Sequence, residues 1–180
     1  MRQGGSAVSL EVMHMGSVGR GAHPDDVLWG STDGVNAYGN RVKAMTPAEM
    51  DQTSAAFAQT CRDAKELGFD MVMLHFAQVW LPAQFLSPAR NHRADDYGGC
   101  LENRMKFPLA IIKAVREAVG PDYPVDLRIS AKEWIDGGIE LHEVLIFLKQ
   151  AEPYLDMVNV SAGQDMDKQG NIHMATSTLE

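Results

Sequence analysis

The feature that most constrains the fold is a regular alternation of short apolar runs with longer amphipathic ones. The apolar runs are residues 7–13, 70–75, 124–130 and 157–160. The amphipathic runs between them are residues 46–67, 101–119 and 141–151. Residues 70–75 (DMVMLH) are almost continuously apolar, which is typical of a strand buried on both faces. The alternation predicts βα units built around a parallel sheet.

The first predicted helix has a clear beginning and end. Thr46 can cap it, Pro47 suits its first turn, and Glu49 can reach back to the amide of the cap. Gly68 then ends it. In the second predicted helix, Pro108 should either introduce a kink or mark the true start, because proline lacks the N–H that an interior position needs.

Three stretches have no clear helical or strand pattern. Residues 16–43 are polar and rich in glycine, so we expect a loop or a hairpin. Residues 76–100 form a long loop that holds several aromatic side chains, and long ordered loops are commonly functional. The tail from residue 163 to residue 180 is polar and predicts no element.

Four strands and three connecting helices point to an α/β fold of the (β/α)8 TIM-barrel type, present as a partial barrel of about four βα units within a single domain, residues 1–180. A closed barrel needs eight units and typically about 250 residues. Four parallel strands leave two open edges, which are costly to expose. Either other strands complete the barrel or the sheet is a smaller open one.

Composition excludes several classes of function. The formal net charge is -8 and the pI is about 5.2, and no cluster of Lys and Arg suits a nucleic acid or an anionic membrane. No apolar run has the length of a signal peptide or a membrane span, so we expect a soluble cytoplasmic protein. Two cysteines, Cys61 and Cys100, are too few and too far apart for a disulfide framework or a metal cluster.

Polar side chains are found where the predicted strands end. In a barrel, the groups that bind and react lie at these carboxyl ends and in the loops that follow. The candidates are Glu11, His14, His75, Arg128, Ser130, Asn159 and Ser161.

Residues 68–104 (GFDMVMLHFAQVWLPAQFLSPARNHRADDYGGCLENR) resemble the central signature of the Old Yellow Enzyme, or NADH:flavin oxidoreductase, family. In that signature a strand ends in His and is followed by Gln-Phe-Leu-Ser-Pro, Asn-x-Arg and Tyr-Gly-Gly-Ser-x-Glu-Asn-Arg. The matching positions are 84–88, 91, 93, 97–99 and 102–104. The resemblance covers about residues 7 to 165 and implies an internal piece of the family's barrel, with the first strands and the late phosphate-binding loops of the family not represented.

The resemblance implies a flavoenzyme. FMN sits on the barrel, NAD(P)H gives it a hydride, and the flavin passes the hydride to an activated alkene of the enone or enoate type. A His with an Asn or a second His binds the substrate carbonyl, where donors stabilise the enolate charge. The cofactor itself carries the redox chemistry.

By position, the resemblance gives three residues a role at the substrate. His75 is the first carbonyl-binding residue, and Gln78 occupies the place of the Asn or second His. Trp80 stands where the family has the tyrosine that protonates the alkene. An indole N–H donates a hydrogen bond but is not a usable acid, so water or another residue would supply that proton.

Three further residues fall where the family contacts the flavin. Arg128 would place a cation against the ring and stabilise its reduced, anionic form. Glu11 replaces a Gln, and His14 belongs to the His-x-Gly segment that closes the first strand. We expect His75, Gln78 and Arg128 to project into a common mouth.

Other interpretations remain open. The chain could be a non-catalytic or truncated barrel fragment without stable flavin binding, which persists as a homo-oligomer or by pairing with a complementing barrel chain. His75 could be a structural histidine, Arg128 a partner for Glu133, and Trp80 a pocket wall. A metal-dependent hydrolase using His14 and His75 is disfavoured, since the sequence has no HxH or HExxH pair.

Overall fold

A computed structural model describes residues 4–23 and 25–163. Its main sheet contains the four expected strands, all parallel, in the order β1 (Ser9–Val12), β5 (Met71–Phe76), β6 (Val125–Glu133) and β7 (Met157–Gly163). Each strand follows its predecessor in the chain through a helix. The predicted βα arrangement is therefore confirmed, with β6 and β7 a few residues longer than the sequence suggested.

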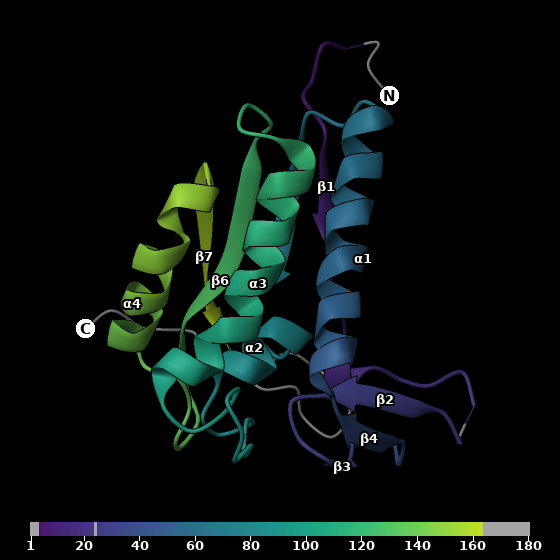
Figure 1. The fold of residues 1–180 in the computed structure, drawn as a ribbon, viewed down its shortest axis with the longest axis vertical. Helices are drawn as coiled ribbons and strands as arrows, with labels where there is room; N and C mark the ends of the chain where they lie inside the picture. Colours follow the sequence, from purple (N-terminus) through teal and green to yellow (C-terminus); the bar gives the residue numbers. More distant parts are fainter. Residues whose placement is uncertain (1–3, 24, 164–180) are drawn as a thin grey trace.

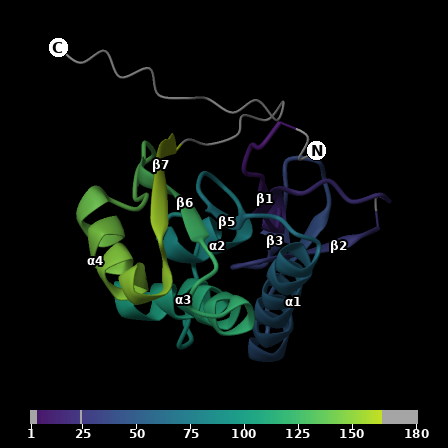
Figure 2. The same ribbon diagram turned by 90° about the horizontal axis from the view of Figure 1, so that it is seen from above.

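Three helices connect these strands and lie on one side of the sheet (Figures 1 and 2). They are α1 (Pro47–Glu66), α3 (Leu101–Val119) and α4 (Leu141–Ala151). The capping box at α1 is present: the Thr46 hydroxyl accepts from the Glu49 N–H at 3.3 Å, and the Glu49 carboxylate accepts from the Thr46 N–H at 2.8 Å.

The helix α3 spans Leu101–Val119 as predicted and continues through Pro108, so of the two alternatives for Pro108, that it marks the true start is wrong. Proline removes one hydrogen bond from the helix. Burial offsets this loss, because Phe107, Ile111 and Ile112 on the same helix are at most 1% exposed. Packing of an apolar face outweighs the local preference of one residue.

The core lies between the helices and one face of the sheet. Side chains of a strand alternate between its two faces, and the residues that face the helices are at most 2% exposed. These are Val72, Leu74, Phe76, Val125, Leu127 and Ile129. The other face, which we call the inner face because it would line a barrel, carries the alternate residues of each strand.

A second, smaller sheet lies at the end of the main sheet where the strands terminate (Figure 1). It consists of β2 (Val27–Gly30), β4 (Arg41–Ala44) and β3 (Gly34–Val35) in that order. The antiparallel pair β3 and β4 is the hairpin that the glycine-rich stretch suggested, and β2 adds a parallel neighbour. A single turn of 3-10 helix, η1 (Gly16–Val18), precedes it, and another, η2 (Glu152–Tyr154), precedes β7.

The stretch expected to be a long loop contains a short helix, α2 (Leu81–Leu86). The sequence analysis did not predict this helix, which has only six residues; Pro82 is in its first turn, where proline is well tolerated. All six residues of α2 are buried. The expectation that the polar tail lacks an element concerns residues 164–180, which lie outside the described residues.

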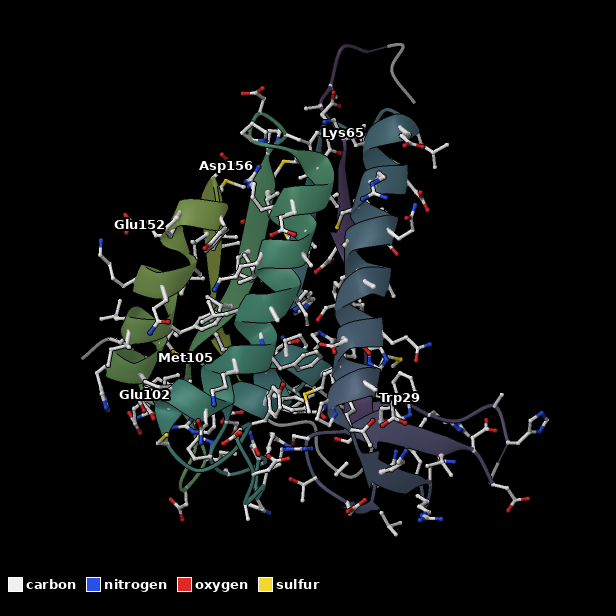
Figure 3. All side chains as sticks on the ribbon, in the orientation of Figure 1. Trp29, Lys65, Glu102, Met105, Glu152 and Asp156 are labelled. Carbon is white, nitrogen blue, oxygen red and sulfur yellow. The ribbon has the colours of Figure 1, made fainter. Side chains whose placement is uncertain are left out.

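The two ends of the main sheet differ in character. At the end where the strands begin, Arg116 pairs with Asp156 at 2.5 Å and Lys65 donates to the Val119 carbonyl at 2.6 Å. Figure 3 labels Lys65 and Asp156 at this end and Trp29 at the opposite one. The candidate residues lie toward the Trp29 end, as expected for a barrel whose functional groups follow its strands.

Candidate active site

The inner face brings polar side chains of neighbouring strands into one row. His75 on β5 is aligned with Arg128 on β6, which is aligned with Asn159 on β7. Glu11 on β1 points to the same side, and its Oε1 lies 3.5 Å from His75 Nε2. Strand alternation explains the grouping, because all four positions fall on the face opposite the helices.

His75 is buried at the centre of this group, with 5% of its surface exposed. Its Nε2 accepts a hydrogen bond from the indole Nε1 of Trp80 at 2.8 Å, and the two rings meet edge to face. The Ala77 N–H points at Nδ1 from 3.3 Å. Burial, assisted by the positive charge of Arg128, lowers the pKa of His75 to about 4. The imidazole is therefore neutral near pH 7.

Arg128 has an unsatisfied polar atom. Its Nε is buried and has no hydrogen-bond partner among the described residues, and the same holds for Ser161 Oγ on the adjacent strand. Glu133, the expected alternative partner of Arg128, is occupied elsewhere: it accepts from Ser87 and from the Ile139 N–H, and Arg90 lies 3.5 Å away. The interpretation of Arg128 as a partner for Glu133 therefore has no support in these contacts.

Gln78 follows β5 in a strained conformation. Its φ of 57° is left-handed, which non-glycine residues rarely adopt. Its backbone N–H donates to Ser130 Oγ at 2.7 Å, and its side chain lines a small cavity with Phe76 and Glu133. Phe76 and Ile129, which face the helices, line the same cavity, so the structure brings His75 and Arg128 together on the inner face but does not bring Gln78 to them as expected. Strain of this kind is concentrated at functional sites.

His14 lies apart from the inner-face group. It lines a pocket with Trp29 and Phe57, and its ring is stacked on Trp29 with centroids 6.5 Å apart. Its Nδ1 accepts the Gly16 N–H at 3.0 Å, and burial lowers its pKa. The structure thus brings Glu11, His75, Trp80 and Arg128 together and places His14 beside α1.

Gln84 belongs to the signature, but its structural role was not predicted from the sequence. It is 1% exposed. Its Oε1 accepts from the Ser17 N–H at 3.2 Å, and its Nε2 donates to the carbonyls of Val79 at 2.6 Å and Met15 at 3.3 Å. The side chain ties the loop after β1 to the loop after β5. This role could have been inferred because Gln84 is a polar residue among the apolar residues of 81–86, and a buried polar group needs hydrogen-bond partners.

Close packing against Gln84 explains a glycine in the His-x-Gly segment. Gly16 has a φ of +61°, and a Cβ added there would lie 2.5 Å from Gln84 Nε2. The Leu81 N–H also donates to the His14 carbonyl at 2.9 Å. These contacts fix the position of Trp80, which immediately precedes α2.

Much of the signature is scaffolding for the smaller sheet. Arg93 donates to the carbonyls of Met45 at 2.9 Å and Ser31 at 3.2 Å. Asn91 donates to the carbonyls of Phe85 and Tyr97, each at 2.8 Å. These bonds hold the loop after α2 against the smaller sheet, which borders the carboxyl ends of the barrel strands.

The described residues present neither a metal centre nor a membrane-spanning helix. Within residues 4–23 and 25–163, no group of three or more His, Cys, Asp and Glu side chains is arranged to hold a metal ion. In the same part of the chain, no helix has the length and apolar character needed to cross a bilayer.

Comparison with known proteins assigns the family. The model of the NADH:flavin oxidoreductase / NADH oxidase family matches residues 2–177. The chain belongs to this family. The match confirms the expected family, whose members are oxidoreductases that bind FMN and use NAD(P)H.

Individual relatives agree with this assignment. The chain is 40% identical over 126 residues to the NADH oxidase of Thermoanaerobacter brockii, covering 69% of this chain and 19% of the relative. It is 34% identical over 164 residues to the NADPH dehydrogenase of Geobacillus thermodenitrificans (strain NG80-2), covering 91% of this chain and 47% of the relative. The chain therefore spans about half or less of these relatives.

A solved structure supports the fold. Morphinone reductase superposes with a TM-score of 0.73 at 24% identity, over 95% of this chain and 50% of that chain. At this identity the likeness concerns architecture alone, and it confirms the expected partial TIM barrel. The described strands form an open sheet rather than a closed barrel.

Proposed function

We propose that this chain supplies the central part of a flavin-dependent enzyme that reduces activated alkenes of the enone or enoate type with NAD(P)H. The observation that carries the proposal is the inner-face group of Glu11, His75, Trp80 and Arg128 at the carboxyl ends of parallel strands. This is where barrel enzymes place their reacting groups.

The inner face offers groups that suit the flavin ring. The buried Nε of Arg128 and the Oγ of Ser161 lack partners among the described residues, and an unmade hydrogen bond is costly in a buried place. The pyrimidine edge of a flavin has carbonyl oxygens that would accept from them. Arg128 would hold that edge and favour extra electron density on it. When bound, FMN would supply the hydride-transfer chemistry.

The remaining residues would act on the substrate and its surroundings. His75 lies beside Arg128 and is neutral near pH 7, so it can offer a hydrogen bond without a charge. Trp80 would form a wall of the site and cannot provide the proton. Protonation of the alkene would then come from water.

Turnover by the full chain loaded with FMN tests this proposal. We expect NADPH consumption without oxygen to depend on an enone, with 2-cyclohexen-1-one yielding the saturated ketone. His75→Ala should slow ketone formation about tenfold or more, the effect of losing about 1.4 kcal/mol of transition-state stabilisation. His142→Ala on the exposed side of α4 is the matched control.

Two outcomes would contradict the proposal in different ways. Oxidation of NADPH by a flavin-loaded protein that never forms ketone would exclude the enone class. Failure of the full chain to retain flavin would favour the non-catalytic fragment.

We further propose that complementary βα units cover the two edges of the main sheet. Among the described residues β1 and β7 each pair on one side only. Beside β7, Met157, Val158 and Leu145 are exposed and line a groove with α4. Barrel closure would bury this surface. Light scattering on the purified chain should show an association of more than one polypeptide, and a stable monomer would contradict this proposal.

The proposed location is the cytoplasm, because nicotinamide reductants are produced and recycled there. Cell fractionation with an antibody to the full chain would test this location, and recovery outside the cytoplasmic fraction would contradict it.

A further inference from the structure

The two hydrogen bonds that point at the ring nitrogens of His75 cannot both form when the imidazole is neutral. A neutral ring carries one N–H and one lone pair. Yet the Trp80 indole N–H points at Nε2 from 2.8 Å, and the Ala77 N–H points at Nδ1 from 3.3 Å. Both neighbours are donors, so only one can be bonded to a lone pair. The position of the single proton depends on which contact is stronger.

The distances decide in favour of Trp80. Its contact of 2.8 Å lies within the ordinary range for a hydrogen bond, about 2.7–3.2 Å, and the other two contacts of the ring lie beyond it. These are Ala77 N to Nδ1 at 3.3 Å and Glu11 Oε1 to Nε2 at 3.5 Å. An indole cannot accept, so the Nε2 that faces it must carry the lone pair.

We propose that Trp80 is a positioning residue that holds His75 in the Nδ1–H tautomer, with the Nε2 lone pair turned toward the indole. In this state Nε2 cannot donate to a substrate carbonyl. A carbonyl ligand must displace the indole, and the proton must move to Nε2, before His75 can serve as a donor. Trp80 therefore sets which ligands the inner face accepts, and this consequence for carbonyl ligands rests on the proposed function.

Removal of the indole N–H should reverse the preference. The two remaining contacts both favour a proton on Nε2, because Ala77 then donates to the Nδ1 lone pair and the Nε2–H faces the Glu11 carboxylate. Trp80→Phe keeps an aromatic ring in the same place and removes only the donor. The wild-type loop geometry should persist, since Gln84 and the Leu81 N–H fix α2 independently of Trp80.

The tautomer can be read directly by nitrogen-15 NMR of histidine-labelled full chain at neutral pH. The His75 signals would be assigned by their loss in His75→Gln. In the wild type we expect the chemical shifts of the Nδ1–H tautomer. In Trp80→Phe the ratio of Nδ1–H to Nε2–H should fall about 2- to 12-fold, which corresponds to the free energy of one hydrogen bond. Trp134→Phe, at an indole that is 54% exposed, should leave the ratio unchanged.

A wild-type spectrum dominated by Nε2–H would overturn the proposal, and this result does not depend on whether any variant folds. An unchanged ratio in Trp80→Phe would overturn it as well. A merely structural role for Trp80 would alter stability without moving the tautomer.

Binding of 2-cyclohexen-1-one by the flavin-loaded chain separates this inference from the proposed function. If the Nε2–H of His75 becomes free to donate in Trp80→Phe, the Kd for the enone should fall, again by about 2- to 12-fold. A tautomer change with no gain in enone affinity would support the positioning role and contradict the assignment of His75 as the carbonyl donor.

Discussion

The two faces of the main sheet make opposite use of the same strands. The face that packs on α1, α3 and α4 is apolar from Val72 to Phe76 and from Val125 to Ile129, whereas the inner face carries Glu11, His75, Asp126 and Arg128. One residue step along β5 or β6 changes a side chain from core to candidate site. Stability and chemistry are therefore encoded by alternate residues of each strand, so mutations at neighbouring positions should have separable effects.

The sharpest comparison is between neighbours on β5. Leu74 faces the helices and is 0% exposed, while Met73 faces the inner side and is partly exposed. Leu74→Ala should lower the free energy of unfolding by about 2–5 kcal/mol, because it leaves a cavity in the core. Met73→Ala, which removes a comparable volume, should cost clearly less. Urea denaturation of the two variants measures this, and equal losses would remove the distinction between the faces.

A second effect concerns the bonds that connect the site loops. Gln84→Leu would leave the Ser17 N–H and the Val79 carbonyl without their partner. Unsatisfied buried groups cost about 1–3 kcal/mol, and amide exchange at Ser17 should accelerate. The control is Gln59→Ala on the exposed side of α1. If Gln84→Leu were as stable as the wild type, with Ser17 still protected, these loops would have to be held by other contacts.

A smaller effect is expected where α1 begins. Thr46→Ala removes the capping hydroxyl and should cost about 1 kcal/mol. Thr60→Ala makes the same replacement at an exposed position of the same helix, where the hydroxyl donates to the Ala56 carbonyl within the helix. The melting temperature of Thr46→Ala should be lower than that of Thr60→Ala. The reverse order would mean that the capping box contributes nothing to the helix that covers the apolar face.

The smallest change in the free energy of unfolding at neutral pH is expected for His75, which affects stability at acidic pH. Its pKa is lowered from 6.5 to about 4 in the folded chain, so between these values the unfolded chain binds more protons. Stability conferred by the neutral imidazole is therefore lost as pH falls from 6.5 toward 4. In His75→Gln the free energy of unfolding should decline less steeply over this window. Identical slopes would show that His75 titrates normally.

The sequence predicted the framework of the fold because strong signals coincide there. The apolar run before His75, the capping box at Thr46 and the stop at Gly68 each have a local physical cause, and all three are confirmed. The extent of α3 was predicted, but the sequence left open whether Pro108 lies inside it, and core packing decides that in favour of a continuous helix. The short helix α2 was not predicted, because six residues are too few to show a helical period.

The candidate site was predictable as a set of positions but not as a set of contacts. Strand ends indicated Glu11, His75 and Arg128, and the structure places these three together. The separation of His14, the indole bond to His75 and the central place of Gln84 depend on loops whose course follows from tertiary packing. No periodicity in a sequence encodes such contacts.

The assignment of the inner face as a flavin site depends on the affinity of the chain for FMN. FMN would be titrated into the flavin-free full chain and followed by quenching of flavin fluorescence. Arg128→Met should weaken binding about 10- to 100-fold, the effect of losing a charged hydrogen bond of roughly 1.5–3 kcal/mol. Arg62→Met, on the exposed side of α1, should leave it unchanged. Equal FMN affinity in the wild type and Arg128→Met would contradict the assignment of the inner face as the flavin site.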